Sequence, residues 1–518
     1  MTINIPIPRL NITDSIIPYV ERLPKQTNME VQLMARKPNI LIFMTDHQRA
    51  DTVLPEHPAI TPNLTAFGRQ GVTFTNTFCP TPHCCPARAT FMTGLYPSRH
   101  GVWNNICNDQ ALSRGLNPGV RCWSEDLRDQ GYRMVYTGKW HVSVEEGPED
   151  RGWQHTHHVG GTKGNLHGQT WDQWKQWATS PEPTERGEGQ ILRPGWGTYT
   201  TYGSTGEKPH HDQTITESAL EALQQVTHSD EPWCLYVGCS MPHDAYWVPQ
   251  KYLDMYKLDD VELPPSYADE MTGKPAVVRR MRQQVFGQLT EREVREAIRH
   301  FRAMCTYLDE LFGSLLTTLD QSGQADNTLV LYCADHGDYC GDHGLFCKGL
   351  PCYDGAYHVP AVVRWPAGIE RPGRRVDELV SLADFAPTFQ QLAGAAPDPG
   401  LTGRSLVPFL NDRIPDGWRD DIHTQCNGVE IYYTQRSVRT MTHKYVYNAV
   451  DFDELYDIAK DPHEMHNVAD DPSYADVKRD LVRRMWRFAC QEQDSAHNSY
   501  VTLAMAPWGP MEGVLIDD

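Results

Sequence analysis

Four short apolar runs, each followed by polar or charged residues, constrain the fold of this chain more than any other feature. They lie at residues 39–44, 134–137, 233–238 and 328–333. An unbroken apolar run of this length is typical of a strand that is buried on both faces. Helix-like segments intervene, the longest at residues 290–319. The sequence therefore predicts an α/β fold with a large, mostly parallel sheet flanked by helices.

The residues that follow the four runs are rich in carboxylates, imidazoles and an ammonium group. In open α/β sheets, ligands bind beyond the carboxyl ends of the strands. We therefore expect these side chains to meet at one edge of the sheet. In chain order they are Asp46 and His47, then Lys139 and His141, then His243, and finally Asp335 and His336.

A second motif places a thiol at the start of a predicted helix. Residues 84–94 read CCPARATFMTG, and proline is favoured at the first position of a helix. Arg88 follows within one turn of Cys84. Cys84 would then lie where free backbone N–H groups favour an anion. Such a position suits a nucleophile that must hold an oxyanion beside it.

The pattern Cys-x-Pro-x-Arg with Thr-Gly five residues further on resembles the signature of the formylglycine-dependent sulfatases, in the alkaline phosphatase superfamily. The resemblance implies that a formylglycine-generating enzyme oxidises Cys84, and not Cys85, to an aldehyde. It also implies an alkaline phosphatase-like fold, one divalent metal ion, and hydrolysis of an aryl- or alkyl-sulfate monoester by the hydrated aldehyde. Because the pair at 335–336 ends in His rather than Asn, the chain leans toward the choline-sulfatase and phosphonate monoester hydrolase branch.

The resemblance also implies a set of metal ligands. Asp46, Asp335 and His336 match the family positions that hold the metal, together with residue 84. His47 stands where that branch has Gln, so it either binds the metal or shapes the surroundings. Carboxylates suit calcium and imidazole also suits manganese, so both metals remain open, with a slight preference for manganese. The competing interpretation is that strand-end Asp residues only cap the following helices.

Further residues match catalytic positions of the family. Lys139 and His141, in the sequence Gly-Lys-Trp-His, match residues that contact the formylglycine, and His141 would drive the release of sulfate. Asp335 is the family's candidate general base. Residues outside these strands match positions near the substrate or the formylglycine. His243 and Lys348 match the pair at the substrate oxygens and leaving group, Arg88 the residue that holds the diol and metal ligands, and Asn105 an active-site Asn of that branch.

Other functions are possible on the same residues. A phosphonate monoester or phosphodiester hydrolase would share the scaffold and the formylglycine, and family members are often promiscuous between the two activities. Gly-Lys-Trp-His favours the sulfatase, because a Lys and a His suit a doubly liganded sulfate.

A thiol phosphatase is disfavoured, because neither Cys84 nor Cys85 has an Arg six residues on. The intact residue set also argues against an inactive binding protein. A zinc site is disfavoured by the spacing of its candidate ligands, Cys340, His343, Cys347 and Cys352.

Composition limits the partners. The chain has 518 residues and a formal net charge of −20, which disfavours nucleic acid and acidic membrane surfaces. No apolar run approaches the roughly 20 residues of a membrane span. The first 37 residues do not resemble a secretory signal. With 14 cysteines, we therefore expect reduced thiols and a cytoplasmic location.

We expect five segments along the chain. These are an N-terminal extension (1–37), a catalytic domain (38–400) with a Gly- and Trp-rich insertion (160–211), a C-terminal α+β subdomain (401–498) and a tail (499–518). The insertion is either a lid or specificity loop, or a surface excursion pinned by its rings; its tryptophans are Trp171, Trp174, Trp177 and Trp196. If the extension or the tail clasps a neighbour, the protein is a homo-oligomer, a dimer or larger.

The C-terminal subdomain has its own pattern. Residues 432–447 are rich in Tyr, Thr and Val, which predicts antiparallel strands. Residues 454–457 and 461–467 resemble the segment near the end of the sulfatases' C-terminal domain, and we expect them to form turn and capping positions. A final helix is predicted at about 476–493.

Overall fold

A computed structural model of the chain describes residues 37–498 and 508–509, apart from the gaps 160–171, 173–174, 177–178, 180–184, 194–196, 397 and 430. Residues 1–36 of the expected extension, most of the tail, and the four tryptophans of the insertion thus lie outside the described residues. None of the described helices is long and apolar enough to cross a membrane.

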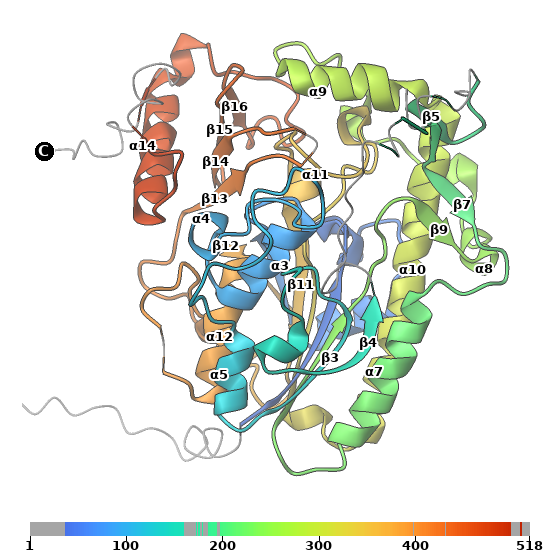
Figure 1. Cartoon of the computed structure of the whole chain (residues 1–518), viewed down its shortest axis with the longest axis vertical. Helices are drawn as coiled ribbons and strands as arrows, with labels where there is room; N and C mark the ends of the chain where they lie inside the picture. Colours follow the sequence, from blue (N-terminus) through green and yellow to red (C-terminus); the bar gives the residue numbers. More distant parts are fainter. Residues whose placement is uncertain are drawn as a thin grey trace, which may run out of the picture. The chain divides into compact units, whose positions relative to one another are not determined.

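An eight-stranded sheet forms the centre of the described chain (Figure 1). All of its strands run parallel except β11, which pairs antiparallel with both of its neighbours. Together with the separate antiparallel sheet described below, this confirms the predicted fold class. The strand order is β12 (Arg374–Ser381), β2 (Val72–Phe78), β11 (His358–Arg364), β10 (Thr328–Ala334), β1 (Asn39–Thr45), β8 (Trp233–Gly238), β3 (Arg133–Lys139) and β4 (Gln154–Val159).

The four strands predicted from apolar runs are neighbours in this sheet. They appear in the order β10, β1, β8 and β3, with Ile40 of β1 aligned with Leu329 on one side and Cys234 on the other. Every residue of β1 is buried, as expected for a strand covered on both faces. Because these strands are parallel, the residues that follow them meet at one edge of the sheet. The other four strands were not predicted.

Helices cover both faces of the sheet (Figure 1). Helices α3 (Cys84–Thr93), α5 (Trp123–Asp129) and α12 (Phe385–Ala393) pack together on one face, and α2 (Pro62–Arg69), α7 (Asp212–Val226) and α10 (Glu291–Gln321) on the other. Helix α10 confirms the predicted long helix. It begins with a capping box in which Thr290 and Glu293 satisfy each other's backbone N–H groups. The remaining helices are short: α4 (Pro97–His100), α8 (Gln250–Leu253), α9 (Ala276–Arg280), α11 (Asp354–Tyr357) and α13 (Val407–Leu410).

A separate antiparallel sheet follows in the C-terminal part. Its order is β13 (Asp421–Cys426), β14 (Gln435–Thr440), β15 (His443–Asn448) and β16 (Glu454–Asp457), and α14 (Ala475–Gln491) packs on it through a buried apolar cluster that includes Trp486. The antiparallel strands and the final helix are confirmed. The expectation of turn and capping positions at 454–457 was wrong, because this segment pairs with β15 and is fully buried.

Two small strand pairs are separate from the main sheet. Strands β5 (Gln190–Arg193) and β6 (Gly197–Thr200) form an antiparallel hairpin, and β7 (Tyr202–Ser204) pairs in parallel with β9 (Tyr246–Val248). The C-terminal sheet also reaches the segment before Cys84. Gln425 of β13 donates from its backbone N–H to the carbonyl of Pro80 at 2.7 Å, and its own carbonyl accepts from the hydroxyl of Thr81.

Candidate active site

Cys84 is the first residue of α3 and is almost completely buried. The helix begins two residues earlier than a start at Pro86 would imply. Pro86 still lies in the first turn, where a missing N–H group leaves no intrahelical bond unmade. Asn105 accepts a hydrogen bond from the backbone N–H of Cys85 at 3.3 Å. The predicted Asn therefore lies at the positive end of the helix, beside residue 84.

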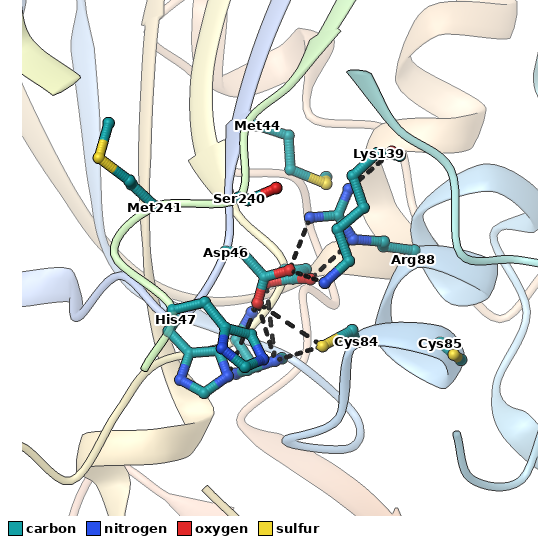
Figure 2. Close-up of polar contacts among 12 residues, drawn as sticks. Met44, Asp46, His47, Cys84, Cys85, Arg88, Lys139, Ser240 and Met241 are labelled. Atoms are coloured by element: carbon teal, nitrogen blue, oxygen red, sulfur yellow. Dashed lines mark hydrogen bonds and ion pairs between the residues drawn. The ribbon is translucent and has the colours of Figure 1, made fainter. Parts of the chain in front are cut away.

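Arg88 joins the carboxylates that follow β1 and β10. Its Nε donates to Asp335 at 2.8 Å and its Nη2 donates to Asp46 at 3.2 Å. Lys139, at the end of β3, also donates to Asp46. Figure 2 shows Arg88 and Lys139 pointing toward Asp46. Burial would raise the pKa of Asp46, as would the neighbouring Cys84, but the cations outweigh both, so its pKa is lowered and it is a carboxylate at neutral pH.

The residues expected to bind a metal ion lie together. Asp46, Cys84, Asp335 and His336 each offer one ligand atom, and these atoms lie within 4.8 Å of one another. The Nε2 atom of His336 is 3.3 Å from Cys84 Sγ, 3.6 Å from Asp46 Oδ1 and 3.8 Å from Asp335 Oδ1. Its Nδ1 donates to the carbonyl of Gly337 at 2.9 Å, so the Nε2 lone pair faces the cluster. Donor atoms this close to one another are suitably placed to bind one cation.

His47 lies beside this cluster, and a carboxylate fixes its orientation. Its Nδ1 donates to Asp338 at 3.0 Å, and its Nε2 lies 3.7 Å from Asp46 Oδ1. Tyr246 donates to the same Asp338 carboxylate at 2.9 Å. Burial, together with the charges of His243 and Lys348, lowers the pKa of His47. The ring is therefore neutral, and its Nε2 lone pair faces Asp46 and accepts a hydrogen bond from Lys348.

Further predicted site residues, Lys348, His243 and His141, also lie close to Cys84. Lys348 Nζ is 3.4 Å from Cys84 Sγ and 3.2 Å from His243 Nε2, and it donates to His47 Nε2. His141 makes a polar contact with the Cys84 thiol. Burial alone would raise the pKa of that thiol, but the charges of Lys139 and Lys348 lower it well below its usual value. The position of residue 84 therefore strongly favours negative charge.

The structure thus brings every predicted site residue to one edge of the sheet. Sequence reasoning missed two carboxylates of the same site, Asp244 and Asp338. The available signal was their position, directly after His243 and two residues after His336. The structure does not support the alternative zinc site. Its four candidate ligands form none of the metal-type clusters found among the described residues, and His343 bonds to Asp269 instead.

The architecture is alkaline phosphatase-like. The crystal structure of the phosphonate monoester hydrolase of Agrobacterium radiobacter superposes with a TM-score of 0.71 at 26% identity, covering 89% of this chain and 97% of that chain. Arylsulfatase K of Danio rerio is 26% identical over 474 residues, 86% of this chain and 82% of that protein. Choline-sulfatase of Rhizobium meliloti (strain 1021) is 30% identical over 454 residues, 84% of this chain and 83% of that protein.

Family models give the same answer at the level of sequence. The sulfatase model matches residues 38–395, and the model of the N-sulphoglucosamine sulphohydrolase C-terminal region matches residues 341–491. The chain belongs to the sulfatase family. It is therefore a sulfuric ester hydrolase, the class to which its relatives named choline-sulfatase and arylsulfatase K belong.

Proposed function

We propose that this enzyme hydrolyses aryl- or alkyl-sulfate monoesters with Cys84, converted to formylglycine, as the nucleophile. One observation carries the proposal. Cys84 is buried at the start of a helix, 3.6 Å from a carboxylate oxygen of Asp46 and 3.3 Å from His336 Nε2, and 3.4 Å from the ammonium group of Lys348. A nucleophile, metal ligands and a cation for the anionic ester thus meet at one residue.

The metal ion would be held by Asp46, Asp335, His336 and residue 84. His47 is a further candidate ligand, because its ring lies within reach of Asp46 and Cys84. When bound, the metal ion would lower the pKa of a hydroxyl group of the hydrated formylglycine, which is the oxygen nucleophile. The imidazoles of His336 and His47 favour manganese over calcium. Arg88 fixes the separation of Asp46 and Asp335, because it donates to both carboxylates.

The remaining residues bind the ester and move protons. The negative charge of the sulfate disfavours its approach to the carboxylates. Lys139 and Lys348 neutralise this charge. Asp335 accepts the proton of the attacking hydroxyl. His243 Nε2, which faces Lys348 at 3.2 Å, donates a proton to the departing alcohol oxygen. The imidazole of His141 then takes a proton from residue 84 as sulfate is released.

A phosphonate monoester or phosphodiester hydrolase is the second candidate, favoured by the fold shared with the Agrobacterium radiobacter enzyme. Turnover of 4-nitrophenyl sulfate and of 4-nitrophenyl phenylphosphonate by the same preparation separates the two. We expect the higher kcat/KM for the sulfate, because the Lys and His of Gly-Lys-Trp-His suit that anion. A dominant phosphonate rate would reverse the assignment.

Metal binding is expected to stabilise the fold. After chelation, added Mn²⁺ at about 100 times its Kd should stabilise the native protein by about 2.7 kcal/mol, because the unfolded chain lacks the site. Thermal unfolding with and without the ion measures this. Asp335→Asn should abolish the shift, while Asp416→Asn, which changes an exposed carboxylate, should preserve it. An equal metal shift in Asp335→Asn and wild type would contradict the ligand assignment.

Maturation by a formylglycine-generating enzyme belongs to the same proposal, since Cys84 lies in the motif that resembles its recognition sequence. The cytoplasmic location, the homo-oligomeric state and the boundaries of the expected domains stay predictions.

A further inference from the structure

The hairpin of β5 and β6 reaches the candidate active site through one side chain, Tyr199. The hairpin lies within the Gly- and Trp-rich insertion. The Tyr199 hydroxyl donates a hydrogen bond to Asp244 Oδ2. The other oxygen of this carboxylate lies 3.3 Å from His243 Nδ1 and 3.7 Å from His47 Nδ1. The hairpin is therefore joined, through the Asp244 carboxylate, to His243, the residue proposed to protonate the leaving group.

Asp244 holds the His243 ring by its Nδ1 atom. That nitrogen donates to the backbone carbonyl of Asp244 and faces the Asp244 carboxylate. A histidine has two ring nitrogens, so anchoring one decides which of them faces the substrate. Here the nitrogen that remains is Nε2, which lies 3.2 Å from Lys348 Nζ. The backbone carbonyl of Asp244, with its carboxylate beside the same nitrogen, thus directs Nε2 toward residue 84 and the ester.

The hairpin is fixed to the body of the protein by several backbone bonds. Glu293 at the start of α10 accepts from the backbone N–H of Gly189 at 2.8 Å, and Gln288 accepts from that of Leu192 at 2.8 Å. Just after the hairpin, Thr201 accepts from the backbone N–H of Tyr246 at 2.9 Å. This last bond brings the segment after Tyr199 beside the segment after Asp244. The contact between these two residues therefore follows from the strand pairing.

The Tyr199 ring is itself held in place. The guanidinium of Arg193, on the partner strand, lies over the ring at 4.2 Å from its centroid. Ile191, which is fully buried, is paired with Tyr199 in the hairpin register. Neither contact involves the hydroxyl. A Tyr199→Phe substitution would keep both and remove only the bond to Asp244.

We propose that Tyr199 is a positioning residue for the leaving-group step. Through Asp244 it holds His243 with Nε2 toward the ester oxygen that departs. As the S–O bond breaks and its electron pair moves to that oxygen, the proton on Nε2 is transferred to it, which gives the neutral alcohol. The proposal rests on the sulfatase function proposed above and gives the insertion a catalytic purpose.

This arrangement predicts an effect that depends on the leaving group. A good general acid contributes most when the departing alcohol is weakly acidic, and little when it leaves readily as an anion. In the mature, metal-loaded Tyr199→Phe enzyme, kcat/KM should stay within about twofold of wild type for the most acidic phenol of an aryl sulfate series. It should fall by about tenfold or more for the least acidic phenol. The plot of log kcat/KM against phenol pKa thus becomes steeper.

Two other variants accompany this measurement. Tyr202→Phe is the matched control, because the Tyr202 hydroxyl is buried near the same hairpin and bonds to no described residue; its slope should equal that of wild type. Asp244→Asn should steepen the slope as Tyr199→Phe does. It tests the same contacts from Tyr199 through Asp244 to His243 if Tyr199→Phe does not fold. An equal loss for every phenol, or a slope unchanged in both variants, would overturn the inference. If wild type hydrolysed no sulfate ester, the proposed function itself would fail.

Discussion

In Cys84→Ala, kcat/KM for an aryl sulfate is expected to fall by about 10⁴-fold or more, because the variant has no residue that can become the nucleophile. The buried cations and carboxylates around residue 84 stay in place, so the protein should still fold and bind the sulfate ester. Steady-state kinetics on protein made together with a formylglycine-generating enzyme measures the loss, and thermal unfolding checks the fold.

The neighbouring thiol supplies the control. Cys85 is also fully buried in the first turn of α3, and its Sγ accepts a weak hydrogen bond from the backbone N–H of Ile106 at 3.5 Å. Cys85→Ala should keep its activity within about tenfold of wild type, since it removes packing and no reacting atom. If Cys84→Ala stayed active while Cys85→Ala lost activity, the nucleophile would be misassigned.

Replacing Arg88 by methionine should lower the free energy of unfolding of the metal-free protein by about 3–5 kcal/mol. Asp46 and Asp335 are fully buried, and Arg88 donates to both, so its removal leaves two carboxylates short of a positive partner. Urea unfolding measures the difference. Arg128→Met, which breaks the exposed pair with Asp129, is the control and should change stability by no more than about 0.5 kcal/mol. A stable Arg88→Met protein would contradict this account of the buried charges.

The deficit of Arg88→Met should depend on pH. In wild type the pKa of Asp46 is lower in the folded state than its ordinary value. Such a group contributes stability above its unfolded pKa of about 4, and that stability is lost as pH falls through the folded pKa. Without Arg88 the folded state stabilises the ionised form of Asp46 less. The folded-state pKa of Asp46 therefore rises, and a proton neutralises the carboxylate at a higher pH than in wild type. Because the unfolded state is the same in both proteins, the gap between their free energies of unfolding should narrow as pH falls from the folded-state pKa of Asp46 in the variant toward the lower folded-state pKa in wild type.

The sequence was most informative where local pattern and chemistry coincide. The runs that became β1, β3, β8 and β10 are mostly apolar because these strands are buried on both faces. Parallel pairing placed the polar residues that follow them together. Strands β2 and β12 were missed because polar or charged residues interrupt their apolar residues, so VTFTNTF and RRVDELVS contain no long apolar run. Strand β4 was also missed, because its sequence QHTHHV contains no apolar run.

The contacts that orient the site residues could not be predicted in the same way. The bond from His47 to Asp338 joins loops 291 residues apart, and the bond from Tyr199 to Asp244 depends on how a hairpin is anchored to α10. Both result from tertiary packing, and no spacing along the chain indicates them. The available local signals were carboxylates close to expected site histidines, one residue after His243 and two residues after His336.

The most direct test is peptide mass spectrometry of the fragment that spans residues 84 and 85, from protein made with a formylglycine-generating enzyme. The proposed function predicts an aldehyde at residue 84 and an unmodified thiol at Cys85. An unmodified thiol at Cys84 in protein that hydrolyses sulfate esters would contradict the formylglycine nucleophile.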